Sequence, residues 1–106
     1  MILFKPEHVG KILTGEKTQT RRIWKKARAK VGSVHLAKTM MLSKEYFVKL
    51  EILAVYQERL KDISDEDARA EGYHNAAAYL IAFCRINHLE KVPDIMVYVI
   101  KFKVIA

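Results

Sequence analysis

Alternating apolar and polar residues predict two long β-strands, one in the middle of the chain and one at its end. In the first, every second side chain is apolar or small, so one face is expected to lie wholly in a core. These side chains are Val48, Leu50, Ile52, Ala54 and Tyr56. The second strand, residues 95–105, is expected to be buried on both faces at its start and on one face at its end. Its continuous apolar face would be Met96, Tyr98, Ile100, Phe102 and Val104. A shorter strand is predicted over residues 33–38, with Val34 and Leu36 facing inward.

Helical spacing and capping residues predict three helices. A first helix begins at a Pro-Glu pair, residues 6 and 7, and is followed by Gly15, which suits a left-handed helix end. A second begins at Ser64, whose hydroxyl can cap a first turn that holds three acidic residues, and it ends at the next glycine. A third begins at Asn75 and runs to about His88.

Strands connected mostly by turns, with few helices between them, favour a mainly antiparallel sheet that is curled or closed. The predicted fold class is therefore α+β with a small β-barrel-like core. A chain of 106 residues is long enough for one such core and too short for two ordinary domains, so one domain over residues 1–106 is expected. No segment reaches the length and apolarity of a membrane span, and a cytoplasmic location is the default expectation. The oligomeric state stays open.

The excess positive charge of the chain is confined to one segment. The chain has 19 Lys and Arg against 12 Asp and Glu, a net charge of +7. Seven basic residues and no acidic one occur between Lys17 and Lys30, so the remainder of the chain is balanced, with 12 of each sign. The segment also holds Trp24, threonines and a glutamine, a mixture suited to phosphate contact and base stacking. It is predicted to be an exposed strand or loop, and Trp24 is either a stacking surface or an anchor to the core.

The pattern Gly15-x-Lys17-x-x-Thr20-x-Arg22 resembles the ASCH domain, a small family related in fold to the PUA domain. The predicted helix before it, the turn at Gly32, the acid-rich second helix and the last strand follow in the same order, so the resemblance covers nearly the whole chain. It implies a PUA-like small β-barrel with short helices packed around it. It also implies a cleft between barrel and helices, and RNA as a ligand.

Some small members of that family are amidohydrolases that deacetylate N4-acetylcytidine with a lysine, a threonine and a glutamate. The resemblance places these on Lys17, Thr20 and Glu71. A threonine hydroxyl needs a base, and lysine is a base only when its pKa falls toward neutrality. Neighbouring cations would lower that pKa and an ionised Glu71 would raise it, and the sequence leaves the balance open. Glu71, at a helix end, is expected to pair with Lys17 or Arg22. Residues three apart in a regular strand face opposite ways, so joint action of Lys17 and Thr20 requires a bend.

The leading hypothesis is an RNA- or nucleotide-binding protein with a basic cleft. Its candidate contact residues are Lys17, Thr18, Thr20, Arg21, Arg22, Trp24, Lys25, Lys26 and Arg28. Glu71 would contact the base edge or a substrate amide, and Tyr73 is an alternative stacking residue. The alternatives are the amidohydrolase, with Lys17, Thr20 and Glu71 as catalytic residues, and a protein-interaction module for an acidic partner. No cofactor is implied, and the spacing of the four histidines does not favour a metal site.

Overall fold

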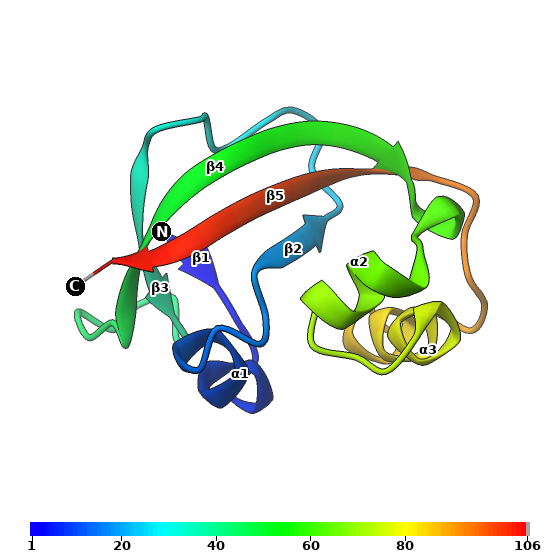
Figure 1. The fold of residues 1–106 in the computed structure, drawn as a ribbon, viewed down its shortest axis with the longest axis horizontal. Coiled ribbons are helices and arrows are strands. Elements are labelled where there is room, and N and C mark those ends of the chain that lie inside the picture. Colours follow the sequence, from blue (N-terminus) through cyan, green and yellow to red (C-terminus); the bar gives the residue numbers. More distant parts are fainter. Residues whose placement is uncertain (106) are drawn as a thin grey trace.

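A curled, five-stranded sheet forms the framework of the protein. The computed structural model describes residues 1–105. Its strands have the spatial order β1-β3-β4-β5-β2, and all neighbours are antiparallel except the β1–β3 pair. The strands are β1 (Ile2–Leu3), β2 (Gln19–Arg22), β3 (Val34–Lys38), β4 (Val48–Arg59) and β5 (Met96–Ile105). Figure 1 shows β4 and β5 as long curved strands that arch over the helices. The sheet is thus a half-barrel, which confirms the expected α+β class.

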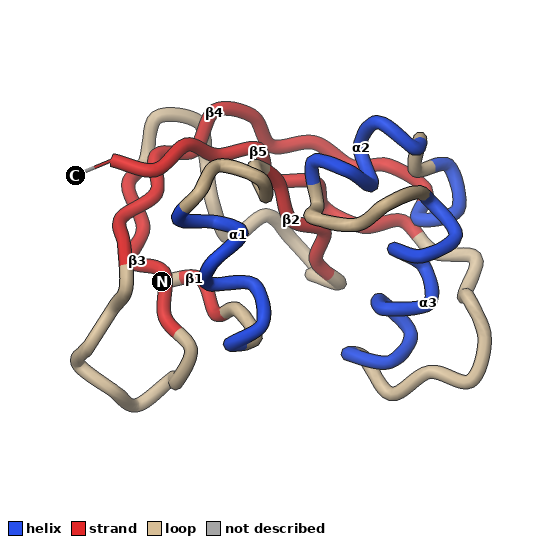
Figure 2. Tube along the Cα trace, turned by 60° about the horizontal axis from the view of Figure 1, so that its bottom comes forward, coloured by secondary structure: helices blue, strands red, loops and turns tan. Residues whose placement is uncertain are grey.

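Three short α-helices and two 3-10 turns pack under this arch (Figures 1 and 2). They are η1 (Pro6–His8), α1 (Val9–Leu13), η2 (Leu60–Asp62), α2 (Asp65–Ala70) and α3 (Ala76–Ile86). The predicted caps are present, because Ser64 Oγ accepts from the amide of Asp67 and Asn75 Oδ1 accepts from that of Ala78. No helix within residues 1–105 is long and apolar enough to cross a membrane.

A β-bulge reverses the faces of β4 in its middle. Leu50 and Ile52 are fully buried, as predicted. The pairing with β5 slips between Ile52 and Ala54, so that Val55 packs toward the core and Tyr56 is 36% exposed. The prediction that one face stays buried through Tyr56 is therefore wrong, because a bulge inserts one residue and exchanges inside for outside.

Two further predictions about buried faces are wrong. In β3, Val34 is 53% exposed and the buried residue is Ala37, which lies on the opposite face from Val34 and Leu36. In β5, Met96 and Val104 are 52% and 40% exposed, because they lie at the strand ends, beyond the two hydrophobic clusters of the protein. An alternating pattern predicts which residues share one face of a strand. Whether that face is buried depends on whether another element packs against it.

The two hydrophobic clusters lie on different faces of β5. One fills the curl of the sheet, and Ile100 and Phe102 belong to it. The other lies under α2 and α3, and Val97 belongs to it together with Tyr79 and Phe83. The strand is therefore buried on both sides from Val97 to Ile100, whereas Met96 at its start is exposed. Where the two clusters meet, side chains of both line one pocket.

Candidate ligand-binding pocket

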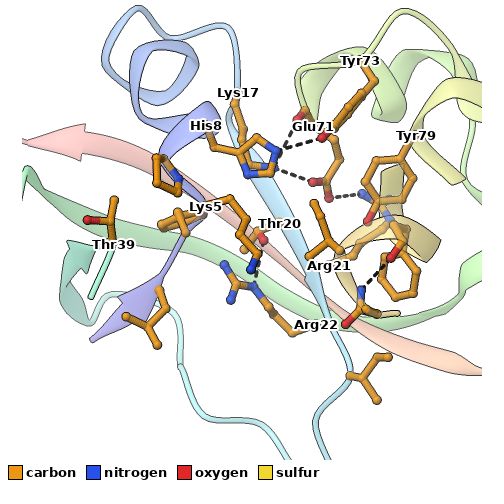
Figure 3. A pocket seen from close by; sticks show the side chains of 17 residues that line it. Lys5, His8, Lys17, Thr20, Arg21, Arg22, Thr39, Glu71, Tyr73 and Tyr79 are labelled. Atoms are coloured by element: carbon orange, nitrogen blue, oxygen red, sulfur yellow. Dashed lines mark hydrogen bonds and ion pairs between the residues drawn. The ribbon is translucent and has the colours of Figure 1, made fainter. Parts of the chain in front are cut away.

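A pocket of about 390 Å³ opens between the α1 side of the molecule and the α2–α3 side (Figure 3). Basic, hydroxyl and aromatic side chains from η1, β2, α3 and the connecting loops surround it. Those that bear on its chemistry are Lys5, His8, Lys17, Thr20, Arg21, Arg22, Glu71, Tyr73, Tyr79 and Phe83. Five candidates predicted from the sequence are therefore brought to one place: Lys17, Thr20, Arg21, Arg22 and Glu71.

Lys17 and Arg21 share one buried carboxylate. Lys17 Nζ lies 2.6 Å from Glu71 Oε1 and also donates to the carbonyl of Glu71 at 3.1 Å. Arg21 Nη1 donates to the other carboxylate oxygen, Oε2, at 2.9 Å. Glu71 is only 1% exposed. The predicted pairing of Glu71 with Lys17 is present, and its second partner is Arg21 in place of Arg22.

Burial decides the direction in which the pKa of Lys17 moves. Its side chain is almost completely buried. The pKa of Lys17 is lowered, chiefly because desolvation disfavours the ammonium, while Glu71 opposes the shift by charge and by hydrogen bonding. Arg22 and Arg21 add a smaller lowering through like charge. The balance left open by the sequence thus falls toward a lower pKa, and desolvation is the largest cause.

Arg21 is held by acidic side chains from two elements. Besides Glu71, its guanidinium contacts Glu58 of β4 at 3.1 Å and Asp67 of α2 at 3.4 Å. Burial lowers the pKa of Arg21, but Glu71 and Glu58 outweigh it, so the pKa is raised. Its Nε, buried, has no hydrogen-bond partner within residues 1–105. The expectation of an exposed strand or loop is wrong for β2, because the carboxylates of Glu58, Asp67 and Glu71 surround Arg21, which is 4% exposed.

Arg22 has a different environment from Arg21. Its Nε donates to Thr20 Oγ1 at 3.0 Å, and its guanidinium lies 4.9 Å from the ring centre of Phe4. Burial lowers its pKa, although Glu71 and Tyr79 oppose the shift. No carboxylate in the part of the chain that the structure describes forms an ion pair with Arg22. Its two terminal nitrogens therefore remain available as hydrogen-bond donors at the pocket.

The chain bends before β2, which places Lys17 and Thr20 at the same pocket. The amide of Lys17 donates to Lys11 of α1, and the amide of Thr18 donates to Ala70 of α2. Regular strand pairing begins only at Gln19. This bend corrects one candidate, since Thr18 does not line the pocket. Its backbone bridges α2 and β5, and its side chain borders a separate hollow beside Glu66 and Lys101.

His8 and Tyr79 line the pocket although sequence reasoning did not select them. Burial and the nearby Lys17 lower the pKa of His8 to about 4, so its ring is neutral near pH 7. Its Nε2 forms a 2.9 Å hydrogen bond with the hydroxyl of Tyr73. Burial, helped by Glu71, raises the pKa of Tyr79. Tyr79 was predicted only as part of a buried helix face, and no local signal separates a core tyrosine from one that reaches a pocket.

The remaining basic candidates lie outside the pocket. Lys25, Lys26 and Arg28 are exposed on the loop that follows β2. Trp24 is half-buried against the cluster inside the sheet, with its ring 6.0 Å from that of Tyr98. Of its two predicted roles, the structure thus shows packing on the core. The loop begins at Ile23, which lines the pocket, so the exposed cations follow directly from its edge.

Comparisons with known proteins show the fold of the chain. No protein-family model matches the sequence, and no curated protein matches it. An ASCH domain from Lactobacillus crispatus JV V101 superposes with a TM-score of 0.69 and 20% identity, over 91% of this chain and 69% of that one. A protein of family DUF984 from Enterococcus faecalis V583 gives 0.71 and 16%, over 93% and 67%. A mutant of the protein ZmASCH from Zymomonas mobilis gives 0.66 and 15%, over 96% and 66%.

These structures share their architecture with nearly all of the chain, which spans about two thirds of their length. The chain therefore has the fold of the ASCH domain. The PUA-like half-barrel with short helices, expected from the resemblance around Gly15 to Arg22, is confirmed at the level of fold. Identities of 15–20% do not carry a ligand or a reaction from those proteins to this one.

Proposed function

We propose that the protein binds RNA or a nucleotide and holds one nucleobase in the pocket. The observation that carries the proposal is the pocket itself: about 390 Å³, lined by buried cations, hydroxyl groups and aromatic rings, and followed by an exposed basic loop. This volume falls within the range of small-molecule sites. Recognition of single-stranded RNA commonly combines an unstacked base with contacts to the phosphates.

The exposure of its cations supports a role of the loop in attracting a polyanion. Lys17 and Arg21 are buried and already paired with carboxylates, so they contribute little to the field outside. Lys25, Lys26 and Arg28 are exposed. Exposed cations are free to replace the counterions of a phosphate backbone, whereas the pocket supplies directional hydrogen bonds.

Binding to short fluorescent single-stranded RNAs, measured by anisotropy at low salt, tests the proposal. Two threonines in the same segment provide a matched pair, because Thr20 lines the pocket and Thr18 does not. Thr20→Val is expected to weaken binding by about 0.5–1.5 kcal/mol, the contribution of one hydrogen bond, and Thr18→Val to leave it unchanged. The absence of RNA binding at low salt, or equal losses in both variants, would contradict the proposal. Co-purification of an acidic protein without nucleic acid would favour an interaction module.

The amidohydrolase is a second candidate, and the lowered pKa of the buried Lys17 favours it. In that reaction a neutral Lys17 takes the proton of Thr20 as the threonine oxygen bonds to the acetyl carbon. The bond from that carbon to N4 then breaks, the amine leaves with a proton, and water releases acetate from Thr20. The geometry is less favourable here, because Thr20 Oγ1 accepts a hydrogen bond from Arg22 while Lys17 donates to Glu71.

Acetate release from N4-acetylcytidine distinguishes the two candidates. The amidohydrolase predicts release that Lys17→Ala and Thr20→Ala abolish and that Thr18→Ala retains. Release by the Thr20→Ala variant at the parent rate would contradict a threonine nucleophile. No acetate from folded protein at high concentration would remove this substrate and leave the binding function in place.

A further inference from the structure

Most acceptors of the pocket are already occupied within the protein. Both carboxylate oxygens of Glu71 accept hydrogen bonds, one from Lys17 and one from Arg21. The hydroxyl of Tyr73 is paired with His8. A ligand that offered only donor groups, such as an amine, would have to displace one of these buried interactions.

The groups that remain available are mainly donors. Arg22 has two free terminal nitrogens, since only its Nε is engaged. Tyr79, 5% exposed, also lines the pocket with its aromatic ring and hydroxyl group. Lys5 also lines the pocket, and no carboxylate of the described residues pairs with it. The donors and positive charges that remain unpaired in the pocket therefore suit a ligand group that is anionic or rich in hydrogen-bond acceptors.

Charge balance points to the same conclusion. Arg21 faces three carboxylates, two of which reach it from β4 and α2. Lys17 shares the third. Arg22 and Lys5 are thus the cations at this pocket that no acidic side chain among residues 1–105 neutralises.

We infer that the ligand carries a phosphate ester into the pocket and that Arg22 binds it. The inference rests on the proposed function and makes the class of ligand more specific: a nucleoside monophosphate, or the phosphorylated end of an RNA, in place of a neutral nucleoside. The two terminal nitrogens of a guanidinium match two phosphate oxygens in a bidentate contact. Thr20 and the ring of Phe4 orient the guanidinium. The aromatic side of the pocket, with Tyr79 and Phe83, is left for the base.

Calorimetric titration with the four ribonucleosides and their 5′-monophosphates tests the inference on the full chain. At least one monophosphate is expected to bind about ten-fold or more tightly than its nucleoside, as for a charge-assisted bidentate contact. Arg22→Gln should bring this ratio close to one. Lys61→Gln removes the same charge at an exposed site away from the pocket and should keep the parent ratio. Arg22→Lys retains the positive charge but cannot make a bidentate contact, so it should give an intermediate ratio. This variant provides the test if Arg22→Gln does not fold.

The outcomes separate this inference from the function on which it rests. Nucleosides and monophosphates that bind the parent equally would overturn the phosphate contact and leave nucleobase binding in place. The phosphate contact of Arg22 would also be overturned if both Arg22 variants kept the parent's preference for the monophosphate over the nucleoside. No binding of nucleoside, nucleotide or RNA would overturn the proposed function itself. An RNA octamer with a 5′-phosphate that binds more tightly than its 5′-hydroxyl counterpart would identify an RNA end as the source of the phosphate.

Discussion

Glu71 pairs with two buried cations in the pocket. Its carboxylate receives Lys17 on one oxygen and Arg21 on the other. Desolvating a charge costs several kcal/mol unless it is paired, so removal of one partner costs more than the pair contributes. The position of Glu71 at the C-terminal end of α2, which is unfavourable for a lone carboxylate, is explained by these two partners.

Glu71→Gln is expected to lower the free energy of unfolding by about 3–5 kcal/mol, since it leaves the buried Lys17 without a carboxylate and removes the most buried of the three carboxylates around Arg21. Glu16→Gln is the matched control, because Glu16 is exposed in the turn before β2 and should change stability by less than about 0.5 kcal/mol. Urea unfolding of both variants gives the comparison. Similar midpoints for the two would show that the Glu71 network adds no stability.

The neutral His8 makes stability depend on pH. Its pKa is about 4 in the folded protein, against 6.5 for an ordinary histidine. Between these values the unfolded chain binds more protons, so the free energy of unfolding falls as the pH drops from 7 toward 4. Because the ring lines an open pocket, the expected loss from pH 7 to pH 5 is about 1–2 kcal/mol.

His8→Asn removes this titration, and the measurement is the difference between the unfolding free energies of parent and variant at pH 7 and pH 5. The stability advantage of the parent over the variant is expected to shrink or reverse at pH 5. At that pH an ordinary histidine is protonated in the unfolded chain, whereas the folded parent keeps His8 neutral, so only the parent loses stability through this residue. Carboxylates that titrate in the same range are common to both proteins and cancel. Parallel pH profiles would show that His8 has an ordinary pKa when folded.

At the scale of elements, the sequence predicted the strands and helices better than their environment. The caps at Ser64 and Asn75 are local signals, since they depend on side chains within three residues of the amides they bind. The bulge in β4 leaves no comparable signal, because Leu53 suits either face. The burial of Arg21 was also out of reach, since it depends on α2, which lies about fifty residues further along the chain and brings Glu71 to it.

The candidate site follows the same division. Lys17, Thr20 and Arg22 were predicted because they fit a motif with fixed spacing, and Glu71 because the resemblance to the ASCH domain places a glutamate in the acid-rich helix. His8 and Tyr79 were missed because the fold, and no spacing, brings them to Lys17. Thr18 was selected wrongly for the pocket, since it lies where the chain turns between α2 and β5.

The turn after α2 requires a glycine at position 72, because of its backbone conformation and its close neighbours. Gly72 has φ = +94°, and an added Cβ would lie 2.9 Å from Lys11 Cδ and 3.7 Å from Lys17 Cβ. Lys11 has little freedom to move, because its Nζ donates to the carbonyl of Gly72 at 2.6 Å. Gly72→Ala should therefore destabilise the protein by about 1–3 kcal/mol.

Gly10→Ala provides the control for this prediction. Gly10 is exposed within α1, and an added Cβ would meet nothing within 4 Å, so alanine should stabilise the protein by up to about 1 kcal/mol. Thermal unfolding of the two variants should show shifts of opposite sign. Shifts of the same sign would contradict the assigned role of Gly72.

At the scale of the whole molecule, the basic residues between Lys17 and Lys30, which account for the net charge of +7, include both buried and exposed side chains. Lys17 and Arg21 are neutralised inside, and Lys25, Lys26 and Arg28 remain on the loop beside the pocket. For single strands, the logarithm of the binding constant falls with the logarithm of salt concentration at about 0.7 per phosphate contact. The salt dependence of RNA binding therefore reports how many phosphate contacts the cations make, on the loop and at Arg22.

A triple alanine variant at Lys25, Lys26 and Arg28 should reduce the steepness of that salt dependence by about 2 and weaken binding most at low salt. Thr20→Val, in contrast, should change the steepness much less, because it removes a hydroxyl group and leaves every cation in place. Anisotropy titrations over a salt series measure both effects. If the triple variant keeps the parent slope, the loop makes no phosphate contacts, and any RNA affinity must come from the pocket alone.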